Sequence, residues 1–471
     1  MGYDPVLEEI ADYIVGSVPL SEAAYRTARW ALADSLSCAF EALAHPEPVS
    51  LLGPVVAGTQ VPDGTPVPGT SYVLDPVSAA FSIGVLIRWL DYNDTWLARE
   101  WGHPSDNFGA ILAAADHMSR QRRRLGEAPY RIRDVLAAAI QAYEVQGILA
   151  LGNSLNQAGF DHVLFVKVAS AGVTVRLLGG GRDEVLSALS NAFADAGPLR
   201  VYRHHPNTGP RKSWAAADAT SRGVWLARLA LLGQAGYPQV LSASPWGFEA
   251  VILGGKPLVL ARPLGSYVME NVLFKVAFPA EFHGQTAVEA ALKLHPQVRD
   301  RLAEVERVLV ETQEPARRII DKPGPFRNPA DRDHSLQYMV AAALVYGELT
   351  YDHYLEPIAQ DPRIDALIGR MEVVEAPEFT EAYFDPERRA IPNALTIRFK
   401  DGSSTGRVVV EYPLGHPRRR PEALPLLREK SRKALRKVFP EGRAERLERL
   451  LWEDEAFPDL AVDRFMDLLR R

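Results

Sequence analysis

The chain has 471 residues, 47% of them hydrophobic and 24% charged, which is more than one hydrophobic core usually serves and predicts two domains. Its net charge of −6 argues against a nucleic-acid-binding protein, because no bulk attraction to phosphate is expected. The single cysteine, Cys38, excludes an internal disulfide and a cysteine-ligated iron–sulfur cluster. Its helical, apolar surroundings predict a position in the core.

No run approaches the ~18 to 20 apolar residues of a membrane span, so no membrane contact is expected. The N-terminal stretch is acidic and amphipathic, and it lacks the basic and apolar regions of a signal peptide. We therefore expect a cytoplasmic protein.

Residues 1 to about 265 are expected to be mostly helical. Val6, Ile10 and Ile14 recur at the spacing of one helix face, and the run from Tyr25 to Phe40 continues that spacing. Residues 46–75 are rich in Pro, Gly and Val without helical periodicity, and they predict a long loop or extended segment. Further helices are expected at about 76–90, 106–121, 133–151, 164–178, 182–194 and 214–231.

The pattern changes near residue 270, where β-rich runs begin to alternate with an apolar helix. Asp401-Gly402 between two such runs predicts a β-hairpin. After residue 411 charged amphipathic helices return, and we expect them to pack on the first domain. The predicted fold class is α with α+β: a large all-helical domain built from residues 1–269 and 412–471, and a smaller inserted α+β lid domain, residues 270–411.

A polar stretch stands out at residues 89–107, between two apolar helices. It holds Asp91, Thr95 and His103 among several other polar residues. A solvated interhelical loop is the simplest interpretation, since such residues are common in loops. The aromatic residues in the same stretch favour a packed loop instead: Trp89, Tyr92, Trp96 and Trp101.

Four more polar clusters precede apolar segments. They contain Asp161 and His162; Arg203, His204, His205 and Lys212; Lys275, Glu281 and His283; and Asp333, His334 and Tyr338. Each cluster alone is explained by helix capping or a surface loop. Together they mix imidazole, ammonium and guanidinium groups at helix starts, which favours a pocket for a small polyanion. No histidine pair has metalloprotease spacing and no cysteine is near, so no metal is predicted, and no G-x-S-x-G motif supports a serine hydrolase.

Five motifs resemble the MmgE/PrpD family, in order along nearly the whole chain. They are RWLDYNDTWLAREWGHPSDN (88–107), GFDHVLFVKVAS (159–170), YRHHPNTGPRKSWAAADATSR (202–222), LFKVAFPAEFHGQTAVEAA (273–291) and NPADRDHSLQYMVA (328–341). The resemblance implies a helical domain made from both chain ends with an inserted lid, a homodimer, and an active site in the cleft between the domains. It also implies catalysis without an iron–sulfur cluster or other cofactor.

The reaction implied by the resemblance is the removal of water from 2-methylcitrate to give 2-methyl-cis-aconitate, in propionate catabolism through the methylcitrate cycle. Citrate could be a further substrate. Two alternatives stay open: decarboxylation of cis-aconitate or isomerisation of another carboxylate by the same family, and carboxylate binding without catalysis. A chemical assay of the products separates them.

The resemblance also implies the site residues. Asp91, Thr95, His103, His162, Lys212, Lys275 and Tyr338 match the family's pocket positions, and His283 and His334 lie in matching motifs. We predict His103 as the proton-transfer group with Asp91 as its partner, and His162 or Tyr338 as the acid. Lys212 and Lys275 are the predicted cations for the substrate carboxylates, and Thr95, His283 and His334 complete the substrate-binding set.

Overall fold

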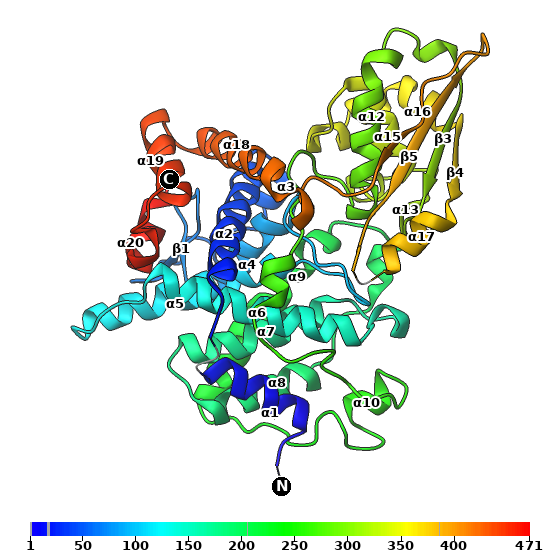
Figure 1. Cartoon of the computed structure of the whole chain (residues 1–471). Coiled ribbons are helices and arrows are strands. Elements are labelled where there is room, and N and C mark those ends of the chain that lie inside the picture. The colour runs from blue at the N-terminus through cyan, green and yellow to red at the C-terminus, as the bar shows by residue number, and fades with distance from the viewer. Residues whose placement is uncertain (1, 17–18, 205, 386) are drawn as a thin grey trace.

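The computed structural model describes residues 2–16, 19–204, 206–385 and 387–471, and most of them are helical. Figure 1 shows a large helical body and a smaller body that contains a sheet. The chain crosses from the first body to the second near residue 275 and returns near residue 415.

The first part of the large body consists of helices, with one small two-stranded sheet among the described residues. Its elements are α1 Pro5–Val15, α2 Glu22–Ala42, α3 Pro46–Val49, β1 Thr65–Pro66, β2 Val73–Leu74, α4 Pro76–Arg88, α5 Phe108–Arg124, α6 Ile132–Gly152, α7 Val163–Leu177, α8 Arg182–Ala194, α9 Arg211–Leu231, α10 Phe248–Val251 and α11 Tyr267–Asn271. The helices predicted between residues 76 and 231 are confirmed with small shifts of their ends. The segment 46–75 is mostly irregular, as expected, apart from α3 and the two short strands.

Helix α4 shows how local sequence places the site. Asp75 caps it, because its carboxylate accepts hydrogen bonds from the backbone N–H of Val77 and Ser78 at 2.9 and 3.1 Å. Pro76 occupies the first helical position, where its missing N–H costs nothing. From Ala79 onward every residue of the helix except Phe81 is buried, and the helix ends at Arg88, directly before the polar loop.

The smaller body packs helices against a mixed sheet. Its elements are α12 Gln285–Val298, β3 Val305–Thr312, α13 Glu314–Ile320, α14 Pro329–Arg332, α15 Leu336–Tyr346, α16 Pro362–Ile368, β4 Met371–Glu375, α17 Pro377–Phe384, β5 Asn393–Phe399 and β6 Val408–Val410. In the described residues the strand order is β4-β3-β5-β6, with β3 parallel to β4 and antiparallel to β5. The predicted hairpin is confirmed, because β5 and β6 pair antiparallel around the turn at Asp401-Gly402.

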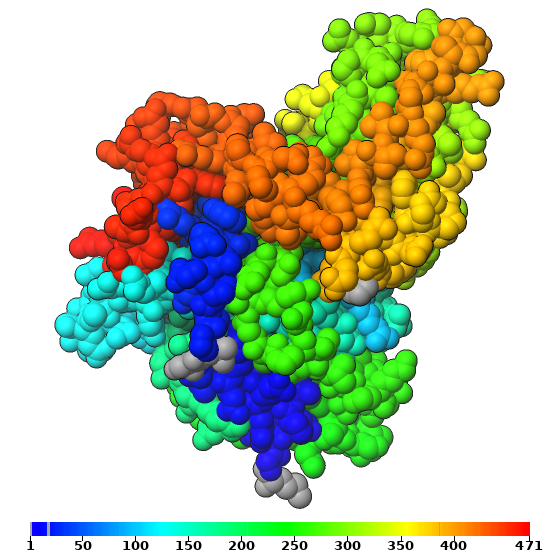
Figure 2. Space-filling view, in the orientation of Figure 1, coloured from blue at the N-terminus to red at the C-terminus, as the bar shows by residue number. Residues whose placement is uncertain are grey.

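The chain then returns to the large body through α18 Arg420–Val438, α19 Glu441–Trp452 and α20 Val462–Leu468. The larger hydrophobic core draws on residues 7–276 and again on residues 423–469, whereas a second core draws on residues 278–410. Figure 2 shows the C-terminal residues, in orange and red, lying against the N-terminal residues, in blue. Motion of the smaller body as a lid stays a prediction.

The large core contains Cys38 and the apolar helix α6, and both bear on what the sequence predicted. Cys38 is fully buried in α2, as predicted. Among the described residues, α6 is long and apolar enough to cross a membrane by length and composition, which corrects the expectation that no run approaches that length. Because 83% of its most apolar window is buried inside the protein, its apolar character is that of a core helix.

Candidate active site

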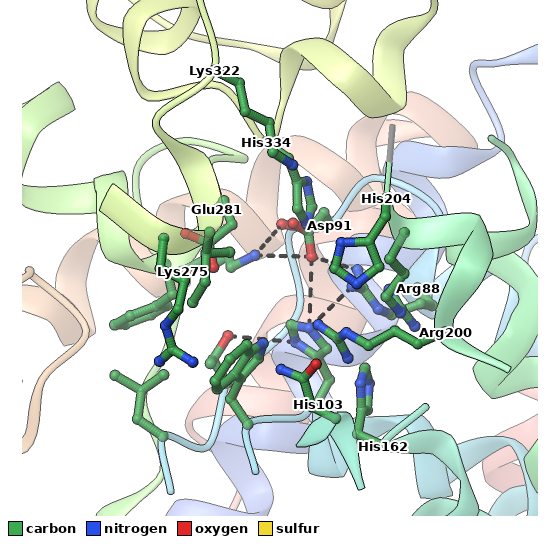
Figure 3. A pocket seen from close by; sticks show the side chains of 18 residues that line it. Arg88, Asp91, His103, His162, Arg200, His204, Lys275, Glu281, Lys322 and His334 are labelled. Atoms are coloured by element: carbon green, nitrogen blue, oxygen red, sulfur yellow. Dashed lines mark hydrogen bonds and ion pairs between the residues drawn. The ribbon is translucent and has the colours of Figure 1, made fainter. Parts of the chain in front are cut away.

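A cavity of about 180 Å³ lies where the two bodies meet, and residues of both bodies line it. The large body contributes side chains from residues 88–103, 156–162 and 200–204. The connection at 275–282 and the segment 318–334 close the other side. Figure 3 shows basic and acidic side chains from these separate segments converging on one point. The volume suits a small metabolite better than a large cofactor.

Asp91 lies at the centre of this convergence. Its Oδ1 atom is 2.5 Å from Nη1 of Arg88 and 3.0 Å from Nζ of Lys275. Lys275 also donates a 2.6 Å hydrogen bond to the backbone carbonyl of Asp91. Although burial opposes ionisation, the charges of Arg88 and Lys275 hold the pKa of Asp91 well below its ordinary value, so it is a carboxylate at neutral pH.

The backbone of Asp91 is itself unusual. Its φ of 49° lies in the left-handed region, which non-glycine residues rarely adopt. The conformation turns the chain sharply just beyond α4, and it lets both the carbonyl and the carboxylate of Asp91 face Lys275. Such strain persists only where the surroundings over-determine it, as the two lysine contacts do here.

His103 is held with one ring nitrogen toward the cavity. Its Nδ1 atom lies 2.6 Å from the carbonyl oxygen of Asp94, which can only accept, so Nδ1 carries the proton. The other nitrogen, Nε2, is then the acceptor, and its lone pair receives a 3.0 Å hydrogen bond from Nη2 of Arg88. Burial, followed by the charge of Arg88, places the pKa of His103 well below its ordinary value. The imidazole is therefore neutral and able to accept a proton.

The loop that carries these residues is buried and cross-linked. Asp94 accepts hydrogen bonds from the N–H and hydroxyl of Ser105 at 3.1 and 2.6 Å. Thr95 exchanges two backbone hydrogen bonds with Leu273 and is 2% exposed, with its hydroxyl 3.4 Å from Nδ1 of His103. The alternative of a solvated loop is therefore wrong for residues 91–95.

His162 faces the cavity from the start of α7. It is buried, and neither of its ring nitrogens makes a hydrogen bond to a described residue, although Nδ1 lies 3.2 Å from Oδ1 of Asp161. Burial and the charges of Arg203 and Arg200 lower the pKa of His162 to about 3, against the opposing effect of Asp161. It is therefore a neutral imidazole, and its ring centre lies 5.9 Å from that of His103.

A second layer of charge comes from the smaller body. Lys212 of α9 reaches across and lies 2.7 Å from both carboxylate oxygens of Asp333 and 3.2 Å from Nδ1 of His334. Glu281 lines the cavity and is hydrogen-bonded at 2.9 Å to Nδ1 of His283. Burial alone would raise the pKa of Glu281, but His283 lowers it to about 2.

Two family models match successive parts of this chain. The MmgE/PrpD N-terminal domain model matches residues 8–261, and the MmgE/PrpD C-terminal domain model matches residues 278–454. The chain belongs to the MmgE/PrpD family. The C-terminal model runs past residue 411 into α18 and α19, whose buried side chains join the larger core.

Several curated members of the family are similar to the whole chain. The 2-methylcitrate dehydratase of Salmonella typhimurium is 52% identical over 469 residues, covering 99% of this chain and 97% of the relative. That of Cupriavidus necator is 52% identical over 468 residues with the same coverage. The mitochondrial 2-methylcitrate dehydratase of Yarrowia lipolytica is 50% identical over 472 residues, covering 99% of this chain and 90% of the relative.

The structure brings together most of the residues predicted from the MmgE/PrpD resemblance. Those that line the cavity are Asp91, Thr95, His103, His162, Lys275 and His334. Lys212 and His283 do not line it in the described structure, but each contacts a residue that does, Lys212 through His334 and His283 through Glu281.

Tyr338 is the predicted residue that the structure keeps away from the cavity. It belongs to the core of the smaller body and is 1% exposed. Its hydroxyl donates a 2.5 Å hydrogen bond to the carbonyl of His353. In this arrangement the hydroxyl donates to a backbone carbonyl and Tyr338 does not line the cavity, so the structure gives no support to Tyr338 as the predicted acid.

Other cavity residues carried no assigned role in the sequence prediction. They include Arg88, Trp101, Arg200, Arg318 and Lys322, together with Arg203, His204 and Glu281 of the polar clusters. The sequence could have indicated Arg88 as a site residue, because an arginine at the end of the otherwise apolar helix α4 needs a buried partner for its charge. His205 lies outside the described residues.

Asp91, Asp333 and His334 also have the composition of a metal site, with one ligand atom each within 4.8 Å of the others. Their charges are already compensated, however. Asp91 is paired with Arg88 and Lys275, and both oxygens of Asp333 contact Lys212. A divalent cation would have to replace these positive groups, so the donor set does not fit a resident metal.

Proposed function

We propose that this MmgE/PrpD protein removes water from 2-methylcitrate to give 2-methyl-cis-aconitate, a step in propionate catabolism through the methylcitrate cycle. The observation that carries the proposal is the buried Asp91–Arg88–Lys275 cluster with a neutral His103 beside it, at the wall of one cavity. The curated relatives that are about half identical over the full length bear the name of this activity.

The charge of the cavity suits a tricarboxylate. Positive side chains outnumber carboxylates along its wall, since Asp91 and Glu281 are the only acidic residues among the described lining residues. A substrate carboxylate that enters would meet guanidinium and ammonium groups in a setting with little water, where charge-assisted hydrogen bonds are strong. The same feature disfavours neutral substrates, because the buried cations would stay unsatisfied.

The elimination needs a base for the carbon-bound proton next to a carboxylate. Nδ1 of His103 is tied to the carbonyl of Asp94, so Nε2 supplies the lone pair. This requires Arg88 to turn the N–H that it donates to Nε2 toward the substrate carboxylate. The resulting imidazolium would lie 3.8 Å from Oδ1 of Asp91, which stabilises the new positive charge. Arg88 and Lys275 stabilise the negative charge that develops on the substrate carboxylate.

The leaving hydroxide needs a proton from a second group of the cavity. With Tyr338 committed to His353, His162 is the candidate that remains from the sequence prediction. Nε2 of His162 has no hydrogen-bond partner among the described residues, so an N–H of the neutral ring is available to the departing oxygen. Its donation leaves an imidazolate on His162. The proton that His103 has taken from carbon then returns to His162, whose ring centre is 5.9 Å away, and both rings are neutral again.

The smaller body is proposed to act as a lid over this chemistry. Residues 318–334 of that body form part of the cavity wall, and Lys212 bonds Asp333 across the junction. Opening would separate this pair and admit substrate, and closing would exclude water. We further propose a cytoplasmic homodimer.

The proposal predicts that purified, chelator-treated protein converts 2-methylcitrate to an unsaturated product, followed by its ultraviolet absorbance. Survival of the activity supports dehydration by side chains alone. Loss on chelation with recovery on adding a divalent cation would contradict the metal-free mechanism. Release of CO₂ from cis-aconitate, with no turnover of 2-methylcitrate, would overturn the dehydratase in favour of decarboxylation.

A further inference from the structure

Arg200 differs from the other buried cations of the cavity in how its charge is used. Arg88 and Lys275 are both paired with Asp91, and Arg203 is paired with Asp161. The nearest carboxylate oxygen to Arg200 is Oε1 of Glu100, at 3.7 Å from Nη1, which is too long for a hydrogen bond. Among the described lining residues, Arg200 is thus the buried cation without a close ion pair.

Two particular nitrogen atoms of Arg200 make no hydrogen bond to a described residue. Its Nε and Nη1 atoms are buried and have no hydrogen-bond partner within the protein, although the residue is only 7% exposed. Figure 3 shows the side chain extending into the cavity toward His103 and His204. A buried guanidinium with open donors is costly unless a ligand fills them, because its desolvation is not repaid.

The surroundings hold Arg200 in this position without satisfying it. The guanidinium lies over the ring of Trp101, with 5.6 Å between its central carbon and the ring centre. The backbone N–H of Arg200 donates a 2.9 Å hydrogen bond to the carbonyl of Gly159, which anchors the short helix Arg200–Arg203. A planar guanidinium held in one position can donate two parallel hydrogen bonds to the two oxygens of a carboxylate.

Glu100 does not compete strongly for this charge. Its Oε2 atom accepts hydrogen bonds from the N–H of Asn156 at 2.8 Å and the hydroxyl of Ser154 at 3.1 Å, and Oε1 has no partner. Burial raises the pKa of Glu100 to about 7, so at neutral pH a large fraction of this group carries no charge. Glu100 is therefore a weak partner for Nη1 of Arg200, 3.7 Å away, and the charge of the guanidinium is left for an anion in the cavity.

We propose that Arg200 binds one carboxylate of the substrate and thereby determines the preference for tricarboxylates over dicarboxylates. This inference rests on the proposed function for the identity of the substrate, but its test is a binding measurement that needs no turnover. The probes are tricarballylate, which has three carboxylates, and two analogues that lack one: glutarate, without the middle carboxylate, and methylsuccinate, without a terminal one.

The experiment compares the wild type with Arg200→Met by titration calorimetry. Arg200→Met is expected to weaken tricarballylate about 10- to 100-fold, which is the range for losing charge-assisted hydrogen bonds to one carboxylate. The affinity for one of the two dicarboxylates should stay at its wild-type value, and that analogue identifies the carboxylate that Arg200 holds. The affinity of Arg200→Lys for tricarballylate should lie between those of the wild type and Arg200→Met, because lysine keeps the charge but cannot donate two parallel hydrogen bonds to one carboxylate.

Arg222→Met is the matched control, because it also removes one positive charge but lies outside the cavity. Arg222 is 43% exposed in its side chain and pairs with Asp195, so its loss should not change the ratio of tricarboxylate to dicarboxylate affinity. Equal weakening of all three ligands by Arg200→Met, or no weakening, would overturn the inference. A wild type that binds tricarballylate but does not dehydrate 2-methylcitrate would overturn the proposed function alone.

Discussion

Asp91 organises the candidate site because one carboxylate is shared by two cations and faces a neutral imidazole. At the scale of single residues, the arrangement gives Asp91 and His103 each one fixed protonation state at neutral pH. Asp91 stays ionised because Arg88 and Lys275 surround it, whereas His103 stays neutral because it is buried beside Arg88. The side chains are therefore set for proton transfer before substrate arrives.

Replacing His103 by alanine is expected to lower turnover of 2-methylcitrate by ~10²-fold or more, since the proton acceptor is removed. Steady-state kinetics measure the loss, and circular dichroism together with thermal unfolding establishes that the variant is folded. His117, a histidine outside the cavity on α5, provides the matched control in His117→Ala, whose turnover should stay near that of the wild type. Near-normal activity of a folded His103→Ala protein would remove His103 from the mechanism.

Glu100 leads to a prediction about pH. Burial raises its pKa from 4.5 to about 7 in the folded protein, so between these values the folded state binds a proton that the unfolded state has lost. The free energy of unfolding should therefore decrease as pH rises through this window, by roughly 3 kcal/mol from this group. Glu100→Gln removes the titration and keeps an acceptor oxygen.

The measurement is urea unfolding of the wild type and Glu100→Gln at pH 5 and pH 8. The stability of the wild type relative to the variant should be greater at pH 5, because all other titrating groups are common to both proteins. A difference that does not change between the two pH values would mean that Glu100 titrates normally in the fold.

At the scale of elements, the loop after α4 depends on a helix at the other end of the chain. Nζ of Lys430, in α18, lies 2.7 Å from Oδ1 of Asp34 in α2. It also donates hydrogen bonds to the backbone carbonyls of Tyr92 at 2.8 Å and Lys275 at 3.0 Å. One buried ammonium thus joins two helices to the two segments that carry Asp91 and Lys275.

Replacing Lys430 by methionine should destabilise the protein by about 3–5 kcal/mol, because Asp34 is left buried without its partner. The double variant Lys430→Met with Asp34→Asn removes both charges, so it should recover part of this loss. Urea unfolding of the two single variants and the double variant gives the coupling energy between the positions. Additive losses would contradict the pairing seen in the structure.

At the scale of the whole molecule, the large core needs both chain ends. Residues after the return near 415 contribute buried side chains to it, among them Leu427, Leu447 and Phe465. Each such side chain stabilises a fold by about 1.5–3 kcal/mol, against a total of about 5–15 kcal/mol for a typical domain. The C-terminal helices are therefore part of the unit that carries the site, although more than a hundred residues separate them from its other half in sequence.

Deleting residues 420–471 should accordingly prevent cooperative folding of the large body. Near-ultraviolet circular dichroism and a thermal melt measure this directly. A truncated chain that melts at the wild-type temperature would show that α18, α19 and α20 are accessory.

Much of this protein followed from local sequence. The apolar periodicity of residues 76–231 predicted the helices, and the Asp401-Gly402 turn predicted the hairpin, because both signals depend on neighbours in the chain. The polar motifs predicted that Asp91, His103 and Lys275 would share a pocket. The motif of Tyr338 could not reveal that its hydroxyl donates a hydrogen bond to the backbone carbonyl of His353, away from the cavity.

Contacts between distant segments could only come from the tertiary structure. The left-handed turn at Asp91, the link from Lys430 to Asp34, and the open donors of Arg200 all depend on segments that meet only after folding. The physical reason is that protonation and hydrogen-bond satisfaction are set by burial and by charges in space, whereas sequence patterns report periodicity and turn chemistry. Sequence alone determined which residue types are available to the site, and the fold decided which of them are left free to act on a substrate.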